Sequence, residues 1–152
     1  AGKLKITNSF VETDPVFSSW LSGNPLTGLT TKTLQISFKA IYGTSPVWKL
    51  LDMETGTASF PNGIQITSIY VKSSEADPTT ELTGDIKYCD AQGTGAFPGA
   101  NPTLIAAIDT TTGNYSQTGM TTTVATNKVV YLSLDAIADD SVWTITINYT
   151  LL

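Results

Sequence analysis

The last twelve residues of the chain, 141 to 152, alternate between apolar and polar side chains. This period of two is typical of a β-strand with one buried face and one polar face. A strand of this length needs partners on both sides, so the segment predicts a sheet in which it lies centrally. The apolar parity consists of Trp143, Ile145, Ile147, Tyr149 and Leu151, and the polar parity of Thr144, Thr146, Asn148 and Thr150.

Other segments carry strand signals separated by turn residues. Residues 33–42 and 128–135 alternate in the same way, and residues 85–90 are a shorter strand. The apolar run 47–53 fits a strand that is buried on both faces or bent by a bulge. In residues 64–72 the apolar positions expected to face inward change from even to odd numbers between Ile66 and Ile69. One extra residue in the strand would explain this change.

Two segments are less regular. Residues 103–109 fit either an apolar strand or a single helical turn, and the Thr-rich residues 110–123 are expected to be a long exposed connection. About eight strands with little helix predict an all-β fold, an antiparallel β-sandwich of jelly-roll type.

The amino-terminal residues differ from this pattern. Asp14 can cap a helix whose first position suits Pro15, and Gly23 can end it. Such a helix has about two turns and is marginal alone in water, so its apolar face must pack on the β-domain or on a neighbouring chain. We therefore expect an arm with a short helix and linker at residues 1–31 and a head domain at 32–152. The residues expected at an interface between chains are Val16, Phe17, Trp20 and Leu21.

Composition argues against several classes of function. Charged residues make up 14% of the chain, all 8 basic residues are lysine, and the net charge is -5. An acidic chain of this kind gains little from neutralising phosphates, so nucleic-acid binding is not expected. No apolar run approaches the roughly 20 residues that a membrane helix needs, and no membrane insertion or retained signal peptide is expected.

Catalytic and metal-binding patterns are also missing from the sequence. Histidine is absent and Cys89 is the single cysteine, which removes the usual zinc ligands, His-containing triads and any intrachain disulfide. The acidic residues fall in loops without the spacing of an EF-hand. The glycine-rich residues 93–99 include Pro98 and are followed by Pro102, and both prolines oppose a phosphate-binding helix. We predict no enzyme activity, no cofactor and no metal site.

Three aromatic residues are not assigned firmly to the core by pattern. Trp48, Phe97 and Tyr115 could stack on a sugar ring, and they are the candidate contacts for a glycan. Packing within the domain is the alternative role for each.

The segment Glu12-Thr13-Asp14-Pro15-Val16-Phe17 resembles a short sequence that recurs in bacteriophage fibre proteins, where it precedes or punctuates trimeric domains. The resemblance covers some 12 of the 152 residues. It implies a homotrimeric fibre or decoration protein of a virion, with the amino-terminal segment near the three-fold axis and the β-domain as a distal head.

The sequence therefore favours a non-enzymatic structural protein on the virion surface. The expected partners are two further copies of the chain, other virion proteins and, as a candidate ligand, a host surface glycan. The alternative is a secreted carbohydrate-binding module, which would be a monomer with exposed aromatic residues on a concave face.

Overall fold

The computed structural model describes residues 31–53, 60, 62–74, 81–91, 97–111 and 113–152. These residues form eight β-strands and no helix, which confirms the all-β prediction. The short helix expected near Asp14 and most of the predicted arm lie outside the described residues, so both stay predictions. The strands are β1 (Thr31–Ala40), β2 (Val47–Asp52), β3 (Ile64–Ser73), β4 (Thr83–Asp90), β5 (Thr103–Asp109), β6 (Tyr115–Val124), β7 (Lys128–Leu134) and β8 (Ser141–Leu151).

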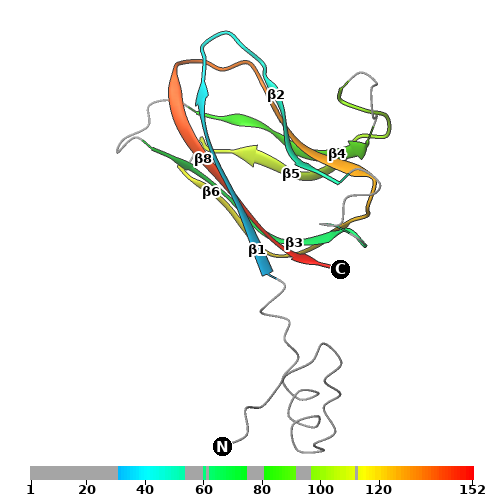
Figure 1. The fold of residues 1–152 in the computed structure, drawn as a ribbon. Coiled ribbons are helices and arrows are strands. Elements are labelled where there is room, and N and C mark those ends of the chain that lie inside the picture. Colours follow the sequence, from blue (N-terminus) through cyan, green and yellow to red (C-terminus); the bar gives the residue numbers. More distant parts are fainter. Residues whose placement is uncertain (1–30, 54–59, 61, 75–80, 92–96, 112) are drawn as a thin grey trace, which may run out of the picture. The chain divides into compact units, whose positions relative to one another are not determined.

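The strands form two antiparallel four-stranded sheets packed face to face (Figure 1). One sheet has the order β1-β8-β3-β6 and the other the order β2-β7-β4-β5. Every connection passes from one sheet to the other except the one from β4 to β5, which stay paired. Eight strands wound in this order make a jelly roll, the form of sandwich that the sequence predicted.

The closing strand β8 lies centrally in its sheet, as the sequence predicted. It pairs with β1 from Thr31↔Thr150 to Ala40↔Ser141 without a shift of register, and on its other side it pairs with β3. Its inward residues Trp143, Ile145, Ile147 and Tyr149 are buried. The polar residues between them point to the outer face, because successive side chains of a strand alternate.

Two predicted irregularities are present. In β3, Ile66 pairs with Tyr149 and Ser68 with Asn148, so Thr67 is the extra residue that shifts the inward parity. In β2, Lys49 pairs with Tyr131 and Leu51 with Val130, which makes Leu50 the extra residue of a bulge. Each bulge lets apolar side chains on both sides of the shift reach the core.

One prediction is wrong. Residues 110–123 were expected to be an exposed connection, but most of them belong to β6, which pairs with β3. Threonine favours extended backbone because its branched side chain is crowded in a helix and packs well on a sheet, and Met120 and Val124 supply a sparse buried row. Residues 103–109 form a strand, which settles the two alternatives left for that segment.

The core lies between the sheets and is built around the Trp143 side chain, which is fully buried. Its indole N–H needs an acceptor because an unpaired buried donor costs free energy. The Ser141 hydroxyl, also buried, accepts this hydrogen bond at 2.7 Å. The pair explains why a polar residue is tolerated at the start of the inward row of β8.

We predict that Ser141→Ala lowers the free energy of unfolding by about 1–3 kcal/mol, because the indole N–H then loses its only acceptor among the described residues. The same substitution in a Trp143→Phe background should cost well under half as much, since no donor is left unpaired. Urea unfolding of the four proteins measures both values. Equal costs in the two backgrounds would show that the hydrogen bond contributes nothing.

Candidate functional site

The residues predicted at the chain interface, Val16, Phe17, Trp20 and Leu21, lie outside the described residues. Their role stays a prediction.

The three candidate glycan contacts occupy different surroundings. Trp48 of β2 points between the sheets, where its ring centroid lies 5.0 Å from that of Phe38. Phe97 packs on the other face of the β2 sheet, edge to face with Tyr131 at 5.3 Å. Tyr115 lies in the opposite sheet, where its hydroxyl donates to Gln117 Oε1 at 2.5 Å. The structure therefore does not bring the three together, and a sugar contact by any one of them stays a prediction.

Ionisable groups among the described residues form four ion pairs. No group of three or more Cys, Asp or Glu side chains that could hold a metal occurs in the described part of the chain. Three pairs lie along the β2-β7-β4-β5 sheet: Lys49 with Asp52, Lys87 with Asp85, and Lys128 with Asp90. The hydrogen bonds from Lys128 and Asn101 hold the pKa of Asp90 below its ordinary value.

Among the described residues there is no apolar helix of membrane-spanning length.

The apolar core reaches the surface between β1 and β2, the edge strands of the two sheets. Five large apolar residues there are only partly buried: Leu34, Ile36, Phe38, Trp48 and Leu50. All of them except Ile36 pack against the core. A cavity of about 270 Å³ opens among the last four, with Leu132 and Ile145 at its base. We call this surface, defined by the five residues, the open side. Its lining is almost wholly apolar, which suits contact with another polypeptide better than a polar ligand.

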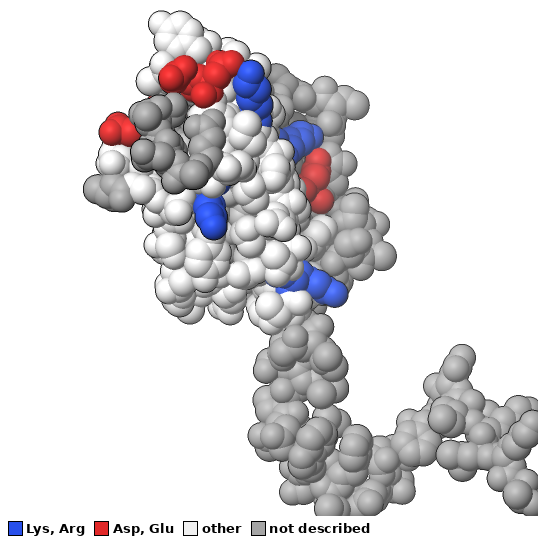
Figure 2. Space-filling model, turned by 90° about the vertical axis from the view of Figure 1, so that its left-hand side faces the viewer, with Lys and Arg blue, Asp and Glu red and all other residues white. Residues whose placement is uncertain are grey.

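The outer face of the β1-β8-β3-β6 sheet is polar but carries little charge. Hydroxyl and amide groups bond across its strands: Thr33 to Asn148 at 2.7 Å, Ser37 with Thr144 at 2.8 Å, and Asn148 to Ser68 at 2.9 Å. Figure 2 shows the side of the domain on which this sheet lies in Figure 1, with few charged side chains.

A shallow groove of about 530 Å³ lies on that polar face. The exposed ring of Tyr70 lines it together with Gln35, Lys72, Thr144 and Thr146. An aromatic ring flanked by hydrogen-bonding groups is the usual chemistry of sugar recognition. Tyr70 was not predicted as a site residue from the sequence. The available signal was its position among the outward-facing residues of β3.

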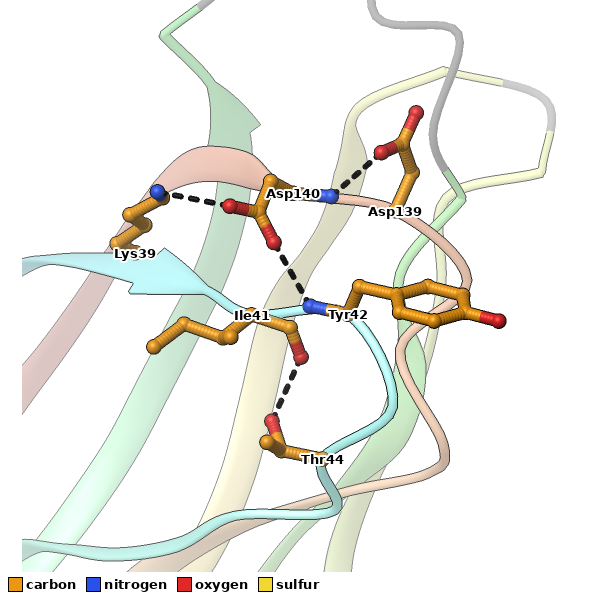
Figure 3. Close-up of polar contacts among 6 residues, drawn as sticks. All are labelled: Lys39, Ile41, Tyr42, Thr44, Asp139 and Asp140. Carbon is orange, nitrogen blue, oxygen red and sulfur yellow. Dashed lines mark hydrogen bonds and ion pairs between the residues drawn. The ribbon is translucent and has the colours of Figure 1, made fainter.

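A third candidate surface is the corner between the β1–β2 and β7–β8 loops (Figure 3). Ile41 and Tyr42 are exposed there to 52% and 70%, although the alternation from residue 33 placed Tyr42 with the inward residues. The Tyr42 N–H donates to Asp140 Oδ1 at 2.8 Å, and Lys39 Nζ lies 2.8 Å from Asp140 Oδ2. Thr44 donates to the Ile41 carbonyl at 2.7 Å, so the loop that carries both apolar side chains is held in place.

No protein-family model matches this chain, and no curated protein sequence matches it. The fold is similar to a chain in the acidic stable capsid structure of Helicobacter pylori bacteriophage KHP30, with a TM-score of 0.46 and 13% identity over 80% of this chain and 88% of that chain. It is also similar to a chain of the cyanophage Pam1 capsid asymmetric unit, with a TM-score of 0.39 and 15% identity over 80% of this chain and 84% of that chain. Both scores are too low to transfer a function.

The corner of Figure 3 makes a prediction for pH. The Lys39 ammonium and the Tyr42 N–H hold the pKa of Asp140 below its ordinary value of 3.8. A carboxylate whose pKa is lowered by folding stabilises the folded state at pH values above the pKa that it has in the unfolded chain. This contribution is lost as the pH falls through the pKa that the carboxylate has in the folded state. The Tyr42 amide chemical shift should therefore titrate with a midpoint below 3.8.

Asp140→Asn should abolish this titration of the Tyr42 amide. The Thr111 amide, which donates to Asp109 Oδ1 at 2.9 Å, is the internal control and should still titrate in the variant. A Tyr42 amide that titrates equally in both proteins would show that Asp140 does not hold the loop.

Proposed function

We propose that the chain is a non-enzymatic structural protein of a bacteriophage virion, in which the jelly-roll domain is a fibre head or capsid decoration domain on the particle surface. The observation that supports this best is the open side, where core residues such as Phe38 and Trp48 stay partly exposed. A domain that exposes part of its core on one side is suited to contact with neighbouring polypeptides.

Two further features support the proposal. The described residues hold ion pairs and a hydroxyl-rich sheet face, and they contain no group of three or more Cys, Asp or Glu side chains that could hold a metal. The segment Glu12 to Phe17, with its resemblance to phage fibre proteins, supports a homotrimer. In that arrangement Val16, Phe17, Trp20 and Leu21 would pack around the three-fold axis.

The virion role predicts that the protein is an abundant component of purified particles made from the genome that encodes it. Quantitative mass spectrometry of density-purified particles should find the chain at many copies per particle, in constant ratio to the major capsid protein. Loss of the chain during purification, with the particles intact, would refute a structural role in the virion.

The homotrimer makes a separate prediction for solution. Light scattering should give three times the chain mass, and Trp20→Ala should shift the protein toward smaller species, because a buried Trp side chain contributes more interface energy than most others. Leu152→Ala, at an exposed site, is the matched control and should not change the mass. A wild-type monomer would contradict the trimer and favour the second function.

The second function is a carbohydrate-binding module, and the Tyr70 groove is the observation that favours it. If the groove binds sugars, Tyr70→Ala should weaken binding to a glycan array by at least about tenfold, since an aromatic stacking contact contributes roughly 1 kcal/mol or more beyond its buried area. Tyr42→Ala, which removes an exposed ring outside the groove, should leave binding unchanged. Absence of binding across the array would exclude this function.

A further inference from the structure

The free edge of β1 is unusual among the edge strands of this sandwich. The four edges are β1 and β6 in one sheet and β2 and β5 in the other. Three of them are interrupted: Leu50 is an extra residue in β2, Ile105 is an extra residue in β5, and β6 shifts register between Thr118 and Thr122. Bulges of this kind twist an edge and keep it from pairing with another strand.

Strand β1 has no bulge. It runs for 10 residues in unbroken register with β8, and it contains no proline. In an antiparallel ladder alternate residues direct their N–H and C=O groups to opposite sides, so about five residues of β1 direct theirs away from β8. No other backbone–backbone hydrogen bond involves residues 31–40 within the described part of the chain.

The open side lies directly beside this edge. Leu34, Ile36 and Phe38 alternate along β1 on the face turned toward the core, and all three are only partly buried. A strand added to β1 would place its own inward side chains over the cavity between β1 and β2. The free backbone edge and the adjoining apolar cavity are two independent features that suit the same kind of ligand, an extended polypeptide strand.

We propose that the partner is β1 of a second copy of this chain, added antiparallel about a two-fold axis. The sequence of β1 is self-complementary in the register that places Ile36 opposite the partner's Ile36. Leu34 then faces the partner's Phe38 on the apolar side, and Gln35 faces the partner's Ser37 on the polar side.

The lysines of β1 are compatible with this register. Lys32 lies opposite the partner's Ala40, and Lys39 lies opposite the partner's Thr33, so no two like charges meet. A two-fold contact uses the same patch on both copies, and each copy covers the cavity of the other. The β1-β8-β3-β6 sheets of the two copies would join through the β1 pair into one sheet of eight strands.

This contact is distinct from the three-fold contact proposed for the amino-terminal segment. If both form, the two-fold contact would link trimers to one another. The β1 contact does not depend on a virion role, and its failure would leave that role standing.

A cysteine cross-link in the full-length chain tests the contact. In the proposed register Ile36→Cys places two cysteines opposite each other, at the Cα separation of about 4.5–5.5 Å that a disulfide accepts. The native Cys89 is fully buried and should not react. Mild oxidation with diamide should convert most of the variant to a covalent dimer. A non-reducing denaturing gel shows this dimer whether the native protein is a dimer, a trimer or a larger assembly, because only the disulfide survives denaturation.

Thr123→Cys, on the exposed part of the interrupted edge β6, is the matched control and should cross-link far less at the same concentration. Equal cross-linking of the two variants, or none at Ile36→Cys, would overturn the proposal.

A charge test covers the case in which Ile36→Cys does not fold. Gln35→Lys with Ser37→Lys puts lysines opposite each other twice across the two-fold axis, whereas Gln35→Lys with Ser37→Glu puts opposite charges there. Both variants lose the Ser37 to Thr144 hydrogen bond, so that loss within the monomer is common to them. Sedimentation should show the β1 contact weaker by at least about tenfold in the first variant than in the second. Equal association of the two would also overturn the proposal.

Discussion

The central position of β8 is the constraint on which the rest of the domain depends. Strands β1 and β3 are not neighbours in the sheet and are joined only through β8. The inward row of β8, from Trp143 to Tyr149, also forms the floor of the core against which the second sheet packs. Loss of register in this one strand would turn its apolar row to the solvent face, because the side-chain period is two.

The same strand explains why the two faces of its sheet have different chemistry. Its outward residues Thr144 and Asn148 bond to hydroxyls of β1 and β3, and Thr146 lies between them, which gives a surface with many polar groups and few charges. Its inward residues need cover over their whole length. The second sheet supplies that cover except beside β1 and β2, where Ile145 is at the base of the open cavity. The exposed apolar surface is thus a consequence of the way the sheets close.

Much of the fold could be predicted from the sequence because most strands show a local alternation of apolar and polar residues. The strands near Ile36, Val130 and Ile145, and the extra residue at Thr67, all follow from a period of two and its interruption. Strand β6 was missed because an edge strand buries little, and its run of threonines has no clear alternation. Its place is set by pairing with β3, a contact distant in sequence.

The candidate surfaces were less predictable. Whether Trp48 faces a sugar or Phe38 depends on how two sheets approach each other, which no local pattern encodes. Tyr42 follows the inward parity of β1 but lies beyond its last residue, where the turn at Gly43 takes the ring into solvent. The free edge of β1 could be recognised only once the strand order was known.

We propose that this domain is a building block whose open side is covered by another polypeptide when the chain is assembled. A cryo-EM map of the particle that carries the chain tests it most directly. We expect density of another polypeptide against Ile36, Phe38 and Trp48, continuous with the free edge of β1. A map in which this surface faces bulk solvent in every copy would contradict the account.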